Sequence, residues 1–140
     1  MSMISALKTY IATYSGLDAN AALLIDVLGK TPTQYALVPI PGARIVETYI
    51  TGKTKREYPF AIQSMESNSD DATRTAINEF YESLADWFET QTEAGTLPTL
   101  AAGKTAESIE PLGWGFLQEF GESGVGIYQI QCKLTYKQES

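Results

Sequence analysis

In the segment 127–137, apolar and polar side chains alternate strictly from Tyr128 onward, and this pattern constrains the fold more than any other feature of the chain. The apolar members occupy every second position: Tyr128, Ile130, Cys132, Leu134 and Tyr136. Successive side chains of a strand point to opposite faces, so a period of two predicts a strand with one buried face and one face in water. Such a strand needs a second layer to cover its buried face.

A long helix over residues 68–93 is predicted to supply that layer, because its apolar side chains recur at steps of three and four. The stripe consists of Ile77, Phe80, Tyr81, Leu84, Trp87 and Phe88. We expect Asn68 or Ser69 to cap the first turn and Gly95 to end the helix. Asp70 is expected just inside the first turn, where the helix dipole favours anions.

A shorter N-terminal helix is predicted to begin after Ser2 and to stop at Gly16. One face of this helix is apolar and comprises Ile4, Leu7, Ile11 and Tyr14. Residues 23–28 fit either a helix or a buried strand, and we favour the strand.

The segments between the two helices and after the second one are rich in β-forming residues. A strand is expected from Gln34, ending near Pro39, because proline cannot donate to a ladder. Residues 44–51 and 55–65 are predicted to form a hairpin around the tip at 51–54. Its second arm places Tyr58, Phe60 and Ile62 on one face.

A further strand is expected over residues 108–117. Its inner face would carry Leu112, Trp114 and Phe116, with the small Gly113 and Gly115 between them. A turn at residues 121–126 would then lead into the last strand.

Together these elements predict an α+β fold with a mostly antiparallel sheet of four to five strands. The N-terminal helix and the long helix pack on one face. A length of 140 residues favours a single domain over residues 1–140.

The absence of histidine and the single cysteine exclude several kinds of active site. They rule out a Ser-His-Asp triad, a Cys-His dyad, a histidine-containing zinc site, an intrachain disulfide and a four-cysteine metal cluster. Cys132 alternates in phase with Ile130 and Leu134, which indicates a buried small hydrophobe rather than a nucleophile. We expect no enzymatic activity, no cofactor and no resident metal.

Three Gly-Lys-Thr triplets resemble the end of a phosphate-binding loop, and they begin at Gly29, Gly52 and Gly103. A P-loop also needs a glycine five residues earlier, so that backbone amides can wrap the phosphates. Those positions hold Leu24, Glu47 and Pro98. The triplets are therefore interpreted as ordinary turns.

The net charge of −7 is concentrated in the second half of the chain. Residues 1–70 carry six basic and six acidic side chains, whereas residues 71–140 carry four basic and eleven acidic ones. Nucleic-acid binding as the main activity is disfavoured, because it needs clustered cations. No apolar run approaches the roughly 20 residues of a membrane span, and the N-terminus lacks the pattern of a signal peptide.

Two charged surfaces remain as candidate interaction sites. The polar side of the long helix carries Glu79, Glu82, Asp86, Glu89 and Glu93. The tip of the predicted hairpin comprises Gly52, Lys53, Thr54, Lys55 and Arg56. Each is compatible with simple solvation, but a basic tip could also meet the acidic face of a neighbouring copy in a head-to-tail contact.

Three stretches of the chain resemble small tail proteins of long-tailed bacteriophages, which are similar to tail terminators (tail-completion or minor tail proteins). They read VETYITGKTKREYPFAIQSMES, LPTLAAGKTAESIE and YQIQCKLTYKQ. The matching residues are Tyr49, Gly52, Arg56, Tyr58, Phe60, Leu97, Pro98, Gly103, Lys104, Tyr128, Gln129, Ile130, Gln131, Cys132, Leu134 and Tyr136. Residues 17–42 match least.

The resemblance implies a structural virion protein at the head-proximal end of the tail, made in the host bacterial cytoplasm. Such proteins form a ring, expected to have six subunits, that caps the tail tube, stops its growth and presents a surface for a head-completion protein. Genome DNA passes through the ring without sequence-specific binding. Two alternatives stay open: a head-closure or neck connector protein, and a monomeric ligand-binding domain or small enzyme, which a cavity between Trp87, Trp114, Phe116 and Tyr128 would support.

Overall fold

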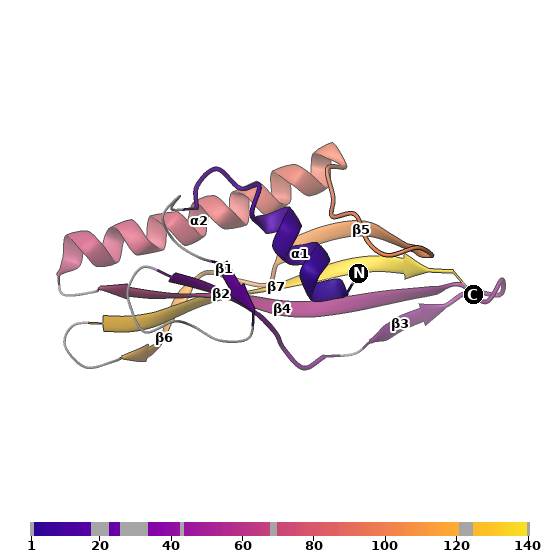
Figure 1. Cartoon of the computed structure of the whole chain (residues 1–140), viewed down its shortest axis with the longest axis horizontal. Coiled ribbons are helices and arrows are strands. Elements are labelled where there is room, and N and C mark those ends of the chain that lie inside the picture. Colours follow the sequence, from indigo (N-terminus) through magenta and orange to yellow (C-terminus); the bar gives the residue numbers. More distant parts are fainter. Residues whose placement is uncertain are drawn as a thin grey trace.

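A computed structural model confirms the α+β fold, with one mostly antiparallel sheet and both helices on the same face (Figure 1). It describes residues 2–17, 23–25, 34–42, 44–67, 70–120 and 125–139. The helices are α1 (Met3–Ile11) and α2 (Asp71–Ala94). The strands are β1 (Leu23–Ile25), β2 (Gln34–Pro39), β3 (Ile45–Thr48), β4 (Thr54–Ser67), β5 (Lys104–Pro111), β6 (Phe116–Phe120) and β7 (Val125–Gln138).

Two long strands, β4 and β7, form the centre of the sheet. They pair antiparallel over fourteen residues each, from Thr54 opposite Gln138 to Ser67 opposite Val125. Two short strands follow one another along each outer edge of this pair: β2 and β3 lie beside β4, while β5 and β6 lie beside β7. The described sheet has seven strands rather than the expected four to five, because each edge is divided between two strands and β1 adds to β2 on the outside.

The parallel pairing of β1 with β2 is the exception to the antiparallel pattern. It confirms the predicted strand for residues 23–25, while residues 26–28 lie outside the described part of the chain. Pro39 is the last residue of β2, as expected for a residue that cannot donate to the ladder.

The core lies between α2 and the inner face of the sheet. The predicted apolar face of β7 is buried throughout, and Cys132 lies opposite Phe60 while Ile130 lies opposite Ile62. The opposite face is less wet than expected, because Gln129 and Thr135 are only 7% and 6% exposed. Strands flank β7 on both sides, and the Gln63 side-chain amide donates to Gln129 Oε1 at 3.0 Å.

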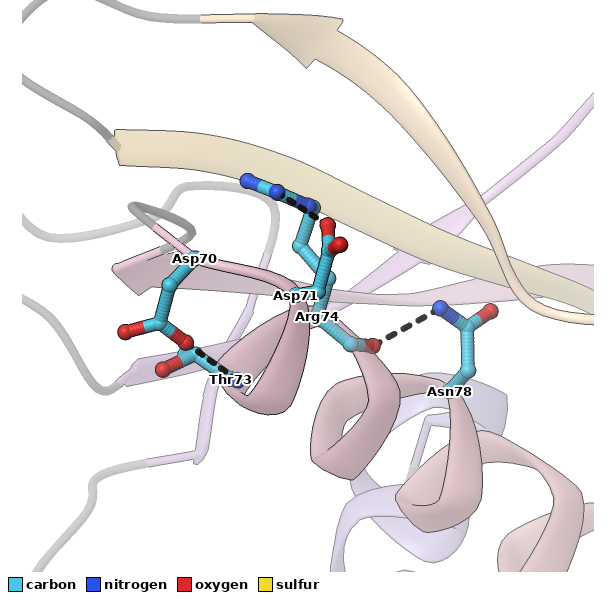
Figure 2. Close-up of polar contacts among 5 residues, drawn as sticks. All are labelled: Asp70, Asp71, Thr73, Arg74 and Asn78. Atoms are coloured by element: carbon cyan, nitrogen blue, oxygen red, sulfur yellow. Dashed lines mark hydrogen bonds and ion pairs between the residues drawn. The ribbon is translucent and has the colours of Figure 1, made fainter.

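The first turn of α2 is capped by Asp70, not by Asn68 or Ser69, which lie outside the described residues. Asp70 accepts a hydrogen bond from the backbone N–H of Thr73 at 2.8 Å. Figure 2 shows this cap together with the Asp71–Arg74 ion pair and the bond from Asn78 to the Arg74 carbonyl. Gly95 ends the helix with φ 73°, as predicted.

The N-terminal helix begins after Ser2, which forms a capping box with Ser5, but it ends at Ile11 rather than at Gly16. Beyond Ile11 the backbone hydrogen bonds join residues three apart rather than four: the Tyr14 N–H donates to the Ile11 carbonyl at 2.9 Å. Leu7 and Ile11 are fully buried.

The predicted strand over residues 108–117 is wrong. β5 ends at Pro111, a bend follows, and β6 begins only at Phe116. Trp114 is 73% exposed, and Leu112 and Phe116 are exposed as well. β5 ends at Pro111, which has no N–H to donate, and the backbone bends at Leu112 and Gly113 before Gly115 passes directly against Tyr81 of α2.

The C-terminal end of α2 is tied to the free edge of the sheet. The Thr92 hydroxyl donates to the Ile109 carbonyl at 2.7 Å and accepts from the Ile109 N–H at 3.0 Å. β5 is an edge strand, so this side chain occupies backbone groups that would otherwise be open to another strand.

Candidate interaction surfaces

The hairpin predicted around residues 51–54 is present, and its tip is a tight turn. The Tyr49 N–H donates to the Lys53 carbonyl at 2.8 Å, and the Gly52 N–H donates to the Tyr49 carbonyl at 2.9 Å. Gly52 has φ 91°, a left-handed conformation that favours glycine. The tip lies at one end of the sheet, next to the C-terminus of the chain (Figure 1).

The predicted basic residues gather at this tip, but two of the three have partners within the chain. Lys53 Nζ lies 3.3 Å from a Glu139 carboxylate oxygen, although its side chain is still 47% exposed. Arg56 Nε donates to Thr54 Oγ1 at 2.9 Å. Lys55 forms no ion pair with any described acidic residue.

The hairpin also exposes apolar side chains that the sequence interpretation overlooked. We define the hairpin patch as Ile45, Val46 and Ile50. Ile50 at the turn is fully exposed, and the two β3 side chains are about half exposed. Every β3 residue is exposed, which is the signature of an edge strand that covers no core.

A second apolar surface lies on the connection between β5 and β6. We define the connector patch as Leu112, Trp114, Phe116 and Leu117, all of them exposed. A Cβ added to Gly115 would lie 2.4 Å from Tyr81 Cβ, so the backbone at Gly115 touches α2 directly. This contact holds the connection in place while Trp114 remains on the surface.

The five carboxylates predicted on the polar side of α2 are all exposed: Glu79, Glu82, Asp86, Glu89 and Glu93. Residues 70–94 carry seven acidic side chains and one basic one. Within the described ranges, none of the five forms an ion pair with a basic residue. The helix therefore presents a field of one sign.

A groove of about 260 Å³ separates part of this acidic face from the connector patch. Residues Ala85, Asp86 and Glu89 of α2 form one wall. The other wall is formed by Pro111, Leu112, Gly113 and Trp114. The groove thus combines two carboxylates with exposed apolar surface.

The hairpin patch lies at one end of the long strands, whereas the connector patch lies closer to their middle: Leu117 and Phe116 pair with Tyr128 and Gln129, and the Leu112 N–H donates to the Gln131 carbonyl. β3 pairs with β4 at residues 54–56, which lie opposite residues 136–138 of β7. β6 pairs with β7 at residues 126–129. Because β3 borders β4 and β6 borders β7, the patches also lie on opposite edges of the sheet (Figure 1).

The four aromatic residues considered for a ligand cavity are spread over three environments. Trp87 packs against the rings of Tyr10 and Tyr14, with centroids 5.2 and 5.0 Å away. Tyr128 is buried in the core, whereas Trp114 and Phe116 are on the surface.

Burial raises the pKa of two side chains in the centre of the core, Cys132 and Tyr81. Burial raises the pKa of the Cys132 thiol, so the thiolate needed for nucleophilic attack is disfavoured. Burial also raises the pKa of Tyr81, although its hydrogen bond with Ser64 acts in the opposite direction. Cys132 is fully buried, as its alternation predicted.

Two of the three Gly-Lys-Thr triplets are confirmed as turns. Gly52 and Gly103 both have positive φ, 91° and 84°. The Lys104 N–H donates to the Ala101 carbonyl at 3.1 Å, which closes the second turn. The triplet at Gly29 lies outside the described residues.

No protein-family model matches the chain, and no curated protein matches it. Among the described residues, no group of three or more His, Cys, Asp or Glu side chains is placed to hold a metal ion. Neither described helix has the length and apolar character required to cross a membrane.

Proposed function

We propose that this protein is a phage tail terminator, which assembles into a ring on the last layer of the tail tube, stops tube growth and offers a surface for head joining. The observation that carries the proposal is the position of the hairpin patch and the connector patch. They are different surfaces on opposite edges of one sheet, and they lie at different positions along its long strands.

Exposed apolar patches of this kind mark interaction sites. When two different surfaces of identical subunits meet, the contact is head-to-tail, and repeating it generates a closed ring or an open filament. A terminator needs the closed form. The resemblance to tail proteins supports a ring of six subunits.

The acidic face of α2 fits a ring through which DNA passes. This face would repel the phosphates of the DNA, whereas a basic lumen would bind them and retard the passage of the DNA. We propose that part of the acidic face lines the lumen, and a ring in which all five carboxylates point outward would contradict this placement. Tube protein and a head-completion protein would bind the two flat sides of the ring.

The proposal is tested by the mass and the activity of the assembly. Size-exclusion chromatography with light scattering, with and without the purified tube protein of the same phage, should detect a ring, and electron microscopy should show tubes of limited length. Converting Lys53, Lys55 and Arg56 to glutamate should weaken assembly in native mass spectrometry. A strict monomer that leaves tube length unlimited would overturn the proposal. A ring that binds a head-side connector but leaves tube length unlimited would indicate a neck protein instead.

A further inference from the structure

We propose that the hairpin tip of one subunit inserts into the groove between α2 and the β5–β6 connection of the next subunit. In this contact Ile50 packs against Trp114 and Leu112, while Lys55 and Lys53 approach Asp86 and Glu89. The inference rests on the proposed ring and names the contact that builds it.

The groove has the size and the chemistry to receive this tip. A cavity of about 150 Å³ is large enough for benzene, so a groove of about 260 Å³ accommodates an isoleucine side chain. Its apolar wall carries Trp114, which is 73% exposed in the free subunit. Burying Trp114 against an aliphatic side chain removes apolar surface of both subunits from water.

The tip is shaped to enter a groove on another molecule. Ile50 lies at the turn, fully exposed, and the turn extends beyond Thr54, where pairing with β7 begins. A subunit's own tip lies at the far end of the sheet on the β4 edge. The groove lies on the β7 edge, where Pro111 pairs with Cys132 near the middle of that strand. The contact is therefore between copies.

Charge makes the contact directional. The tip supplies Lys53 and Lys55, and the groove supplies Asp86 and Glu89, which form no ion pair with any described basic residue. Opposite charges favour tip-to-groove contact, whereas tip-to-tip and groove-to-groove contacts bring like charges together. Such pairs determine orientation more than affinity, and they weaken as salt rises.

Disulfide trapping tests the contact directly. The native Cys132 is fully buried, so it is not available to form disulfides with the introduced cysteines. Copies carrying Ile50→Cys are mixed with copies carrying Trp114→Cys, in the presence of tube protein and a mild oxidant. We expect a disulfide-linked dimer in the mixture and at least tenfold less in either variant alone. Replacing Ile50→Cys by Thr9→Cys, an exposed position on α1, is the matched control and should give no dimer.

A chain carrying both Ile50→Cys and Trp114→Cys should give a ladder of covalent oligomers that ends at the ring number, expected to be six. A dimer from Ile50→Cys alone would overturn the proposal, because it would indicate a symmetric tip-to-tip contact.

A charge exchange provides a second, independent test. Lys55→Glu and Glu89→Lys should each weaken self-association about tenfold at low salt, and combining them in one chain should restore it. Lys8→Glu, with the same change in net charge on α1, should leave assembly within twofold. If the wild-type chain forms rings and the variants Ile50→Ser and Trp114→Ala assemble equally well, the docking contact is wrong and the terminator proposal stands. If wild-type chain forms no ring even with tube protein, the terminator proposal itself fails.

Discussion

The hydroxyl groups of Tyr81 and Ser64 lie 2.5 Å apart in the core and join the long helix to β4. The Tyr81 hydroxyl also donates to the Tyr128 carbonyl at 3.2 Å, so one side chain of α2 is tied to both central strands. Both hydroxyl-bearing residues are almost fully buried. A hydrogen bond in such a setting matters because its partners have no access to water.

Removing this hydroxyl should destabilise the fold. Tyr81→Phe leaves the Ser64 hydroxyl and the Tyr128 carbonyl short of a partner, which costs about 1–3 kcal/mol of unfolding free energy. Urea denaturation of the two proteins measures the loss. Ser64→Ala added to Tyr81→Phe should cost little more, because the two residues share one interaction. Full additivity of the two substitutions would contradict the shared bond.

Gly115→Ala should loosen the β5–β6 connection. The new Cβ would collide with Tyr81 Cβ at 2.4 Å, and overpacking of this kind costs about 1–3 kcal/mol. Thermal unfolding should show a lower midpoint, and the fluorescence of the neighbouring Trp114 should change. Gly113→Ala is the matched control, because nothing lies within 4 Å of its added Cβ. Equal effects at both glycines would argue against the close approach.

Thr92→Val should open the edge of the sheet at Ile109. Valine keeps the shape of threonine but can neither donate to the Ile109 carbonyl nor accept from its N–H. We expect faster hydrogen exchange at the Ile109 amide and a loss of about 1–2 kcal/mol in unfolding free energy. Thr90→Val, at an exposed position of the same helix, should leave both quantities nearly unchanged.

The cap of α2 should make stability depend on pH. Hydrogen bonds from Thr73 lower the pKa of Asp70 below its usual value. The contribution of this carboxylate is therefore complete above the pKa of the unfolded chain and is lost as the pH falls through the lower folded pKa.

A thermal-unfolding series from pH 7 to pH 2 tests this dependence. Asp70→Ala should lower the melting temperature at pH 7 and have progressively less effect at acidic pH. Asp70→Asn, which keeps a capping oxygen without a charge, is the control. At neutral pH its melting temperature should lie between those of the wild type and of Asp70→Ala. A constant difference between wild type and Asp70→Ala at every pH would contradict the assignment.

The spacing of apolar residues correctly predicted those helices and strands that turn one apolar face to the core. The alternation around Cys132 and the helical stripe around Leu84 each describe a surface that meets the core, and both do so, although Phe80 and Trp87 of the stripe are only partly buried. The same reasoning failed for Trp114, because its period-two spacing looks identical whether the face meets the core or solvent. The contact that decides its position joins Gly115 to Tyr81, 34 residues away, which local sequence does not encode.

Pairing between distant segments explains the other differences. The basic tip was predicted from local sequence, but Lys53 meets Glu139 only because β4 and β7 pair in one register. The division of each edge between two strands also depends on that register. The cap at Asp70 differs by one residue from the nearest expected position, within the usual uncertainty of helix ends.

The long pairing of β4 with β7 has a mechanical consequence. Fourteen paired residues at about 3.4 Å each form a strut of roughly 45 Å. One end of this strut carries the hairpin tip, and the groove that we assign to the tip of the neighbouring subunit lies near its middle, where Pro111 pairs with Cys132. The number of paired residues between the tip and the groove, not the flexibility of any loop, would then determine the spacing of subunits in an assembly. Inserting a single residue into one of the two strands would shift this register and turn every following side chain of that strand to the opposite face.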